Sequence, residues 1–211
     1  MTRRLAVLRP EPGNSATAAR IVAAGFDAVR LPLFAVEPLA WTAPDPGEYD
    51  ALLLTSANAV RHAGTALDRL RGVPVVAVGQ ATANAARAAG LTVAITGDGD
   101  AAAVVARARA MRVLHLCGRD RIDAGVDAIP VYVARALPIA SAAILSGTVV
   151  LLHSVRAAKA IAALARRDLV HDLRIAALSE AVRAAGPDAP GAAADAPSDA
   201  ALVALAARLA D

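Results

Sequence analysis

The sequence predicts an α/β fold made of two similar lobes, each a parallel sheet flanked by helices. Short apolar runs alternate with alanine-rich stretches long enough for helices of about 10 to 15 residues, which is the pattern of βαβ units. The strand-loop-helix pattern also repeats along the chain at a spacing of about 99 residues. The length of 211 residues suits two domains of about 100 residues each.

The predicted elements follow one another in the order strand, loop, helix. Strands are expected at four short apolar runs, residues 5–8, 28–31, 51–54 and 75–78. Helices are expected over residues 14–24, 57–70 and 81–89. Asn14 or Ser15 is expected to cap the first helix, and Gly25 to end it. Solvated loops are expected at two segments rich in proline, glycine and acidic residues, 44–50 and 187–195.

Three segments of the first half of the chain align with three segments of the second half in the same order. Residues 52–60, 76–82 and 98–102 match residues 150–158, 176–182 and 197–201. In this alignment His153 stands where the first half has Thr55. Ser179 stands where the first half has Gly79. Three βα units in one order indicate two lobes that are built alike.

The lobes are not expected to be contiguous in sequence. Two extended segments, residues 33–38 and 131–138, each end at a proline, which disfavours helix in the residue before it. If both segments link the lobes, residues 1–35 join residues 138–211 in one lobe, and residues 38–131 form the inserted one. A cleft between the lobes is then the expected place for a ligand.

Composition and charge indicate which classes of ligand and partner to expect and which to exclude. The net charge of +3 and the isoelectric point near 9.7 favour an acidic ligand, but arginine is spread without a basic run, which argues against nucleic acid. No apolar run reaches the roughly 18 residues of a membrane helix, and the first run is too short for a secretory signal. We therefore expect a cytoplasmic protein. A single cysteine excludes an internal disulfide, and the four histidines lack ligand-like spacing, so no metal is expected.

One repeated feature indicates ligand binding. A strand ends at a small or hydroxyl-bearing residue, and a helix begins directly after it. Helix N-termini carry unpaired N–H groups and a partial positive charge, so they bind carboxylate or phosphate. In a parallel sheet these turns all lie at the carboxyl edge, where ligands bind. The alternative is that the hydroxyls only cap helices. The residues concerned are Thr55, Ser56, Gly79, Thr82, Ser154 and Ser179.

Other candidate residues favour structural roles. Residues 97–100 are interpreted as an Asp-capped turn and not as a dinucleotide loop, since Asp98 and Asp100 would repel a pyrophosphate. Cys117 is expected to be a small core residue at the end of a strand. For Tyr132 the spacing favours packing, and a phenol that faces the cleft as a hydrogen-bond or proton donor is the alternative.

Five segments carry a resemblance to a known family. The most specific is residues 50–60, Asp-Ala-Leu-Leu-Leu-Thr-Ser-Ala-Asn-Ala-Val. The others are an opening strand with an Arg-Pro loop, a helix-ending glycine with a second strand, a glycine-to-threonine turn and a Val-Tyr pair, at residues 5–10, 25–33, 76–83 and 131–132. In order and spacing these segments resemble the uroporphyrinogen-III synthase family over nearly the whole chain.

The resemblance implies a cofactor-free enzyme that cyclises hydroxymethylbilane, a linear tetrapyrrole, to uroporphyrinogen III with inversion of ring D and loss of water. It implies that Tyr132 is the acid that assists departure of the hydroxyl group. It also implies a small-molecule substrate that is received from hydroxymethylbilane synthase. Nothing in the sequence calls for more than a monomer. The residues that the resemblance and the loop positions place at the substrate are Arg9, Thr55, Ser56, Ala57, Gly79, Thr82, Ser154 and Ser179.

The second lobe departs from the family's pattern. Ser179 stands where a glycine is expected, and Val182 where a threonine is expected. The acidic Glu180 stands where the first lobe has Gln80, and His153 also replaces a threonine. A non-catalytic two-lobed protein that binds a tetrapyrrole or another polyanion is therefore the alternative hypothesis.

Overall fold

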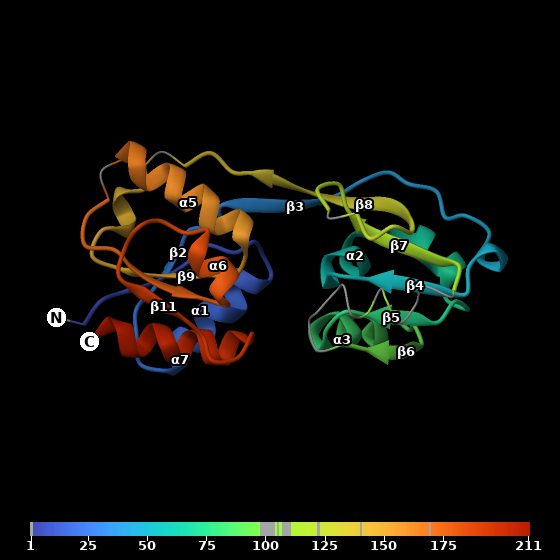
Figure 1. Ribbon diagram of the computed structural model, residues 1–211, viewed down its shortest axis with the longest axis horizontal. Helices are drawn as coiled ribbons and strands as arrows, with labels where there is room; N and C mark the ends of the chain where they lie inside the picture. Colours follow the sequence, from blue (N-terminus) through green and yellow to red (C-terminus); the bar gives the residue numbers. More distant parts are fainter. Residues whose placement is uncertain are drawn as a thin grey trace. The chain divides into compact units, whose positions relative to one another are not determined.

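The computed structural model describes residues 2–97, 104, 106, 111–121, 123–139, 141–168 and 170–211. The chain divides into two compact units. Unit 1 comprises the residues up to Ala35 and those from Ala136 onward, and unit 2 comprises Val36–Arg135. In each unit, helices flank a sheet whose central strands run parallel, so the predicted α/β class is confirmed (Figure 1).

The described residues of unit 1 form a five-stranded sheet and four α-helices. The strands are β1 (Leu5–Val7), β2 (Ala28–Arg30), β9 (Val149–Leu152), β10 (Arg174–Ala177) and β11 (Gly191–Ala193). The helices are α1 (Gly13–Ala23), α5 (Val155–Asp168), α6 (Glu180–Ala184) and α7 (Asp199–Ala210), with a short 3-10 helix, η3 (Ala143–Leu145). The strand order is β11-β10-β9-β1-β2, and every neighbouring pair is parallel.

The helices of unit 1 cover both faces of its sheet, as parallel strands that are apolar on both faces require. Helices α1 and α7 pack on one face, around a core that includes Leu5, Ile21 and Leu205. Helices α5 and α6 pack on the other face, around Val150 and Ile161. Figure 1 shows α5 and α7 on opposite sides of the strands.

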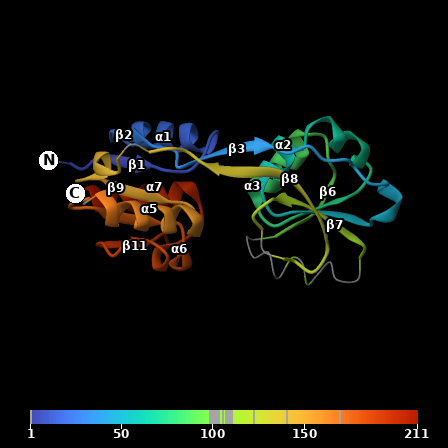
Figure 2. The same cartoon turned by 90° about the horizontal axis from the view of Figure 1, so that it is seen from above.

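The described residues of unit 2 form a six-stranded sheet and two α-helices. The strands are β3 (Phe34–Pro38), β4 (Ala51–Leu54), β5 (Val75–Ala77), β6 (Val93–Thr96), β7 (Val113–Gly118) and β8 (Asp127–Ala136). The helices are α2 (Ala57–His62) and α3 (Gln80–Ala88), with the 3-10 helices η1 (Pro46–Glu48) and η2 (Gly64–Leu70). The strand order is β3-β8-β7-β4-β5-β6, with β3 and β8 side by side (Figure 2). In this sheet, β3 and β8 run antiparallel to each other.

The sheet of unit 2 also has two apolar faces. Helices α2 and α3 pack on one face against Leu52, Leu54 and Leu114. The alternate residues of the same strands, such as Leu53 and Val113, form a second cluster on the other face. This alternation follows from the two-residue period of a strand.

Both sheets have a switch point, where the strand order reverses direction. In unit 1, β1 and β9 are neighbours, and the chain continues from β1 to β2 on one side and from β9 to β10 on the other. In unit 2, β7 and β4 are neighbours, and the chain continues to β8 on one side and to β5 on the other. Open α/β sheets bind ligands at the carboxyl ends of the strands at such a point. Each unit therefore has a defined place for polar chemistry.

The helix predicted over residues 57–70 is wrong in length. Helix α2 ends at His62, and the 3-10 helix η2 follows it. Gly64 adopts a φ of 64°, in the left-handed region that L-residues rarely enter. A left-handed glycine just after the last helical residues is a common way to end a helix. Farther along the chain, the solvated loop predicted over residues 187–195 is wrong at residues 191–193, which form the exposed edge strand β11.

The predicted cap of the first helix is also wrong. Helix α1 begins at Gly13 after Pro12, whose side chain offers no acceptor. The Glu11 carboxylate accepts a hydrogen bond from the backbone N–H of Ser15 (3.0 Å). Asn14 lies fully buried inside the helix, and its Nδ2 atom donates hydrogen bonds to the backbone oxygens of Val7 (2.9 Å) and Arg9 (3.0 Å). This side chain therefore ties α1 to the end of β1.

Candidate functional site

The carboxyl edge of unit 2 brings together predicted residues from neighbouring strands. Thr55 follows β4, which pairs with β7 so that Leu54 lies opposite Leu116. Tyr132 lies in β8 opposite Gly118, the last residue of β7. Since neighbouring strands are about 4.8 Å apart, the backbones of Thr55 and Tyr132 are separated by about 10 Å. Both residues therefore lie at the switch point.

Thr55 is paired with a histidine that the sequence did not place at the site. The Nε2 atom of His115, on β7, is 3.0 Å from the Oγ1 atom of Thr55. The imidazole is buried, with 2% of the residue exposed. Burial, helped by the charge of Arg121, lowers the pKa of His115 to about 4, so the ring is neutral near pH 7. Its Nδ1 atom is buried and has no hydrogen-bond partner within the described part of the chain.

A register shift between β7 and β8 sets the direction of the Tyr132 side chain. Pro130 lies opposite Cys117, whereas Tyr132 lies opposite Gly118, so β8 carries one extra residue at this point. Such a bulge turns the following side chain away from its regular face. Val131 and Tyr132, which would otherwise alternate, both pack against the core beneath α2 and α3.

The ring of Tyr132 is half-buried and covers Gly118. A Cβ atom at position 118 would lie 2.8 Å from Cζ and 3.0 Å from the hydroxyl oxygen of Tyr132, so a larger residue would displace the ring. The imidazole of His62, at the end of α2, lies 6.3 Å away between ring centroids with a tilt of 41°. Tyr132 thus packs, and its hydroxyl group lies beside the last residue of β7.

Three of the predicted hydroxyl groups cap helices. Each serine Oγ accepts a hydrogen bond from a backbone N–H in the first turn of the helix: Ser56 from Asn58 (3.2 Å), Ser154 from Ala157 (3.2 Å) and Ser179 from Val182 (3.4 Å). The capping that the sequence left open is therefore present at these residues. Two of the capped helices are short, with six residues in α2 and five in α6.

The remaining predicted residues of unit 2 lie at the starts of α2 and α3. Ala57 is the first residue of α2. Gly79 is the N-cap of α3 and adopts extended backbone angles. Thr82 lies in the first turn of α3 and is buried. The turns after β4 and β5 are adjacent because these strands pair.

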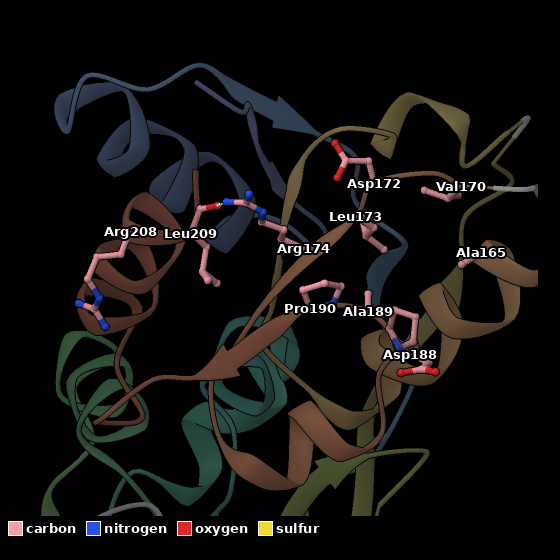
Figure 3. Close-up of a pocket in the computed structure, with 11 residues that line it drawn as sticks. Ala165, Val170, Asp172, Leu173, Arg174, Asp188, Ala189, Pro190, Arg208 and Leu209 are labelled. Carbon is pink, nitrogen blue, oxygen red and sulfur yellow. Dashed lines mark hydrogen bonds between the residues drawn. The ribbon is translucent and has the colours of Figure 1, made fainter. Parts of the chain in front are cut away.

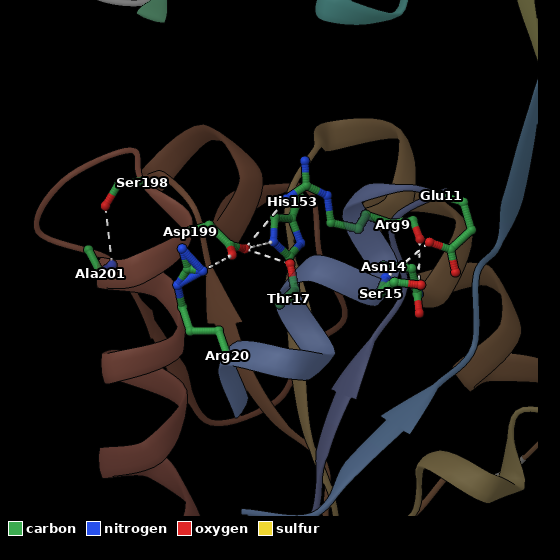
Figure 4. Close-up of polar contacts among 10 residues, drawn as sticks. All are labelled: Arg9, Glu11, Asn14, Ser15, Thr17, Arg20, His153, Ser198, Asp199 and Ala201. Carbon is green, nitrogen blue, oxygen red and sulfur yellow. Dashed lines mark hydrogen bonds and ion pairs between the residues drawn. The ribbon is translucent and has the colours of Figure 1, made fainter. Parts of the chain in front are cut away.

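The carboxyl edge of unit 1 is organised around Asp199, which the sequence did not single out as a site residue (Figure 4). Its Oδ1 atom accepts hydrogen bonds from the Thr17 hydroxyl (2.7 Å) and from Nε2 of His153 (2.9 Å). Nη1 of Arg9 lies 3.4 Å from Oδ1, and Nη1 of Arg20 lies 3.3 Å from Oδ2. One carboxylate thus holds a hydroxyl, an imidazole and two guanidinium groups.

The register of the sheet explains why these groups meet. Val7 lies opposite Leu151, so Arg9 and His153, each two residues farther on, reach the switch point together. Asp199 is the first residue of α7, where the positive end of the helix favours a carboxylate. No local pattern links residues that are 182 and 46 positions apart, as Thr17 and His153 are from Asp199.

Asp199 is ionised and His153 is neutral. Burial raises the pKa of Asp199, but the hydrogen bonds from His153 and Thr17 outweigh it and lower the pKa to about 2. Burial lowers the pKa of His153, against the opposing effect of its hydrogen bond to Asp199. Because an ionised carboxylate only accepts hydrogen bonds, His153 donates through Nε2–H. Its buried Nδ1 atom makes no hydrogen bond of ordinary geometry among the described residues, although the backbone oxygen of Leu151 is close enough to oppose the lowering of the pKa.

A cavity of about 650 Å³ lies at the opposite edge of the unit 1 sheet (Figure 3). It is lined by residues at the start of β10 and β11 and at the end of α7, including Arg174, Pro190 and Leu209. Nη1 of Arg174 donates to the backbone oxygen of Leu209 (2.5 Å). None of the predicted site residues lines this cavity, and it lies away from the carboxyl edge. We do not assign it to the site.

The predicted structural role of Cys117 can be compared with its surroundings. Cys117 is buried, its Sγ atom lies 3.5 Å from the backbone oxygen of Ile129, and burial raises its pKa, so it is a core residue as predicted. Asp98 and Asp100 lie outside the described residues.

In the part of the chain that is described, no three His, Cys, Asp or Glu side chains gather as metal ligands would. No helix in that part has the length and apolar character needed to span a membrane.

The fold and these edges define a class of protein: two α/β units with hydroxyl, imidazole and guanidinium groups at the switch points of parallel sheets, where such folds bind small polar molecules. A family model described as Uroporphyrinogen-III synthase HemD matches residues 15–203. The chain belongs to this family, and the resemblance predicted from the sequence is confirmed.

Solved structures share the fold. The uroporphyrinogen-III synthetase from Helicobacter pylori 26695 has a TM-score of 0.67 and 17% identity, over 98% of this chain and 99% of that one. A mutant uroporphyrinogen III synthase from the extremely thermophilic bacterium Thermus thermophilus has a TM-score of 0.59 and 14% identity, over 95% of this chain and 96% of that one. At these identities the likeness concerns the fold. No curated protein sequence matches the chain.

Proposed function

We propose that this chain is a uroporphyrinogen-III synthase that cyclises hydroxymethylbilane to uroporphyrinogen III, with inversion of ring D and loss of water. Membership of the family supports this activity. The observation that carries the assignment of the site is the position of Thr55, paired with His115, and of Tyr132 at the switch point of unit 2. The reaction makes the enzyme a cyclising lyase.

Tyr132 is the proposed acid. Its phenol donates a proton to the terminal hydroxyl of hydroxymethylbilane, the C–O bond breaks, and water leaves. The electron pair of the adjacent pyrrole stabilises the resulting azafulvene. The substituted carbon of ring D attacks it to give a spiro intermediate, which fragments and recloses the other way. The closed ring then loses a proton, which returns to the Tyr132 phenolate. The bulge in β8 and the contact with Gly118 support this role, because both fix the position of the phenol.

The substrate carries carboxylates on every ring, so it needs hydrogen-bond donors and positive charge along its length. In unit 2 we assign carboxylate contacts to Thr55, Ser56, Ala57, Gly79 and Thr82. In unit 1 we assign them to Arg9, Ser154 and Ser179. Arg9 and Arg20 bring two positive charges to that edge, of which Asp199 offsets one. The protein's task is to hold a reactive chain in its closing geometry, which is catalysis by positioning.

We further propose that the enzyme acts as a cytoplasmic monomer and takes its substrate directly from hydroxymethylbilane synthase. The single cysteine suits a reducing compartment. Direct hand-over suits a substrate that cyclises on its own to the unturned isomer. Light scattering of the purified chain measures the oligomeric state, and a dimer would contradict this part of the proposal.

The decisive experiment supplies the purified chain with fresh hydroxymethylbilane, oxidises the products and separates uroporphyrin isomers I and III. We expect isomer III well above the control without enzyme. Tyr132→Phe is expected to lower kcat about a hundredfold while the affinity for uroporphyrin III holds, since the phenol acts in proton transfer. Isomer I alone, formed at the spontaneous rate by the unmodified chain, would show a protein that binds without catalysis.

A further inference from the structure

His115 takes no part in the proposed reaction steps. This side chain is buried at the switch point of unit 2, with Nε2 3.0 Å from the hydroxyl oxygen of Thr55. Its other nitrogen, Nδ1, is buried with no partner in the described residues. Buried polar atoms without a partner are rare, and each calls for an explanation.

The bare nitrogen decides which way the hydrogen bond to Thr55 runs. A neutral imidazole carries one N–H and one lone pair. Orphaned N–H donors are rarer in protein interiors than acceptors with an unused lone pair. The favoured tautomer therefore keeps Nδ1 as the lone pair and places the hydrogen on Nε2.

This tautomer determines which hydrogen bonds the Thr55 hydroxyl group can still make. A hydroxyl group has one hydrogen to donate and two lone pairs to accept with. If Nε2–H of His115 donates to Oγ1, it occupies one lone pair and leaves the hydroxyl hydrogen for another acceptor. Thr55 is part-exposed, and within the described residues its side chain makes no hydrogen bond besides that to His115. The free hydrogen is then available to a ligand.

We propose that His115 is a positioning residue that donates through Nε2–H to Thr55 and so directs the Thr55 hydroxyl hydrogen at a carboxylate of the bound tetrapyrrole. This inference rests on the proposed function for the identity of the ligand. The arrangement suits a carboxylate because that group only accepts hydrogen bonds. It also strengthens the donor, since a hydroxyl that accepts one hydrogen bond is polarised to donate another.

The tautomer is tested on the unmodified protein. Long-range ¹⁵N–¹H NMR spectra of histidine-labelled chain distinguish a protonated from an unprotonated ring nitrogen. We expect Nε2–H and bare Nδ1 for His115 near pH 7. Protonation of His115 on Nδ1 would overturn the proposal, whatever the activity of the chain.

The effect of His115 on ligand binding is tested with two amide side chains whose nitrogen atoms occupy different positions of the ring. The amide nitrogen of Gln occupies the place of Nε2, whereas that of Asn occupies the place of Nδ1 and does not reach Thr55. We expect His115→Asn to weaken uroporphyrin III binding about tenfold, the usual loss of a hydrogen bond to a charged group. His115→Gln is expected to return the affinity to within about threefold of the unmodified chain. Thermal melts confirm that both variants fold.

A double-mutant cycle separates positioning from mere structural support. Thr55→Val removes the hydroxyl group and keeps the shape, and we expect the same loss of about tenfold. If His115 acts through Thr55, His115→Asn has no further effect on binding in the Thr55→Val background. Additive losses would overturn the proposal. Because binding is the readout, failure of the unmodified chain to make isomer III counts against the proposed function and leaves this test intact.

Discussion

Unit 1 and unit 2 place similar groups at the switch points of their sheets and use them differently. In unit 1, the hydroxyl of Thr17 and the imidazole of His153 both donate to Asp199, a carboxylate of the chain itself. In unit 2, the hydroxyl of Thr55 pairs with the imidazole of His115, and within the described residues no carboxylate bonds to either side chain. Donors that already hold a carboxylate stabilise the fold, whereas a hydroxyl with a free hydrogen suits a ligand.

A repeated fold therefore does not carry a repeated set of polar contacts. The internal repeat aligns His153 with Thr55, and both follow the strand at the switch point. With histidine in unit 1, the edge gains a second donor for Asp199. With threonine in unit 2, the imidazole comes from the neighbouring strand and the hydroxyl is left at the rim. Substitutions and pH changes in each unit test this contrast.

The largest effect is expected from Asp199→Ala. It leaves the buried Thr17 hydroxyl and the His153 N–H without an acceptor and removes the counter-charge of two arginines. We expect unit 1 to lose about 3 to 4 kcal/mol of unfolding free energy. Far-UV circular dichroism in urea would show the loss, while fluorescence of Trp41, the sole tryptophan and a residue of unit 2, would keep its transition.

Asp195→Ala is the matched control for this change. Asp195 lies in the segment before α7, its side chain is 94% exposed, and its pair with Arg208 spans 3.9 Å. Exposed ion pairs of this kind contribute little to stability. Equal shifts for Asp195→Ala and Asp199→Ala would refute the special role of Asp199.

The second effect is the acid sensitivity of unit 2. The pKa of His115 is lowered to about 4 in the folded chain, below the ordinary value of 6.5. Below pH 6.5 the unfolded chain therefore binds the proton first, and unfolding free energy is lost as the pH falls from about 6.5 to about 4. The shift corresponds to about 3 kcal/mol.

Urea titrations followed by Trp41 fluorescence measure this dependence. His115→Gln, which does not titrate, should flatten the slope between these pH values, and an unchanged slope would exclude His115 as its origin. In unit 1, the pKa of Asp199 is lowered to about 2, so the stability that its ionisation contributes is present above about pH 4 and is lost toward pH 2.

The third effect tests how closely Tyr132 must be placed. Gly118→Ala puts a methyl group within 2.8 Å of the Tyr132 ring, so the phenol must move. We expect kcat for isomer III to fall about tenfold with little change in melting temperature. Gly72→Ala, in the same unit with no atom near the new methyl, is the control and should leave kcat as it is. Normal turnover by Gly118→Ala would mean that the phenol's position is not critical.

The smallest effect concerns the caps. Ser56→Ala removes the acceptor for the N–H of Asn58 and should cost unit 2 about 1 kcal/mol, seen by Trp41 fluorescence. Ser179→Ala should cost unit 1 a similar amount, seen by circular dichroism alone. Substitution by glycine at either position should cost only a few tenths of that, because glycine is tolerated at a cap. Equal losses for alanine and glycine would show that the serines act other than as caps.

Much of the fold could be predicted because it depends on neighbours in sequence. The runs at 51–54 and 75–78 are apolar on both faces, as buried parallel strands are, and both became strands close to their predicted ends. The repeat predicted two similar units before any contact was known. The errors fell where a single residue changes the course of the chain. Gly64 ends α2 early, and Pro12 moves the start of α1.

The site could be predicted only in part. Thr55, Ser56, Gly79 and Ser154 lie at strand ends, which local patterns locate. The role of His115 is not predictable, because a lone histidine inside an apolar strand carries no signal of its hydroxyl partner 60 residues away. The aim of Tyr132 depends on a register shift that leaves no mark in the sequence of β8.

The α/β class, the order of the elements and the duplicated pattern follow from local polarity and spacing, and the family follows from the motifs that resemble it. Which donors meet which acceptors depends on the tertiary structure. Strand order and register bring Arg9 beside His153 and Thr55 beside His115, and they place Asp199 among donors from three distant segments. Those pairings depend on how the whole sheet is assembled, because a hydrogen bond requires an approach to about 3 Å that no local pattern specifies.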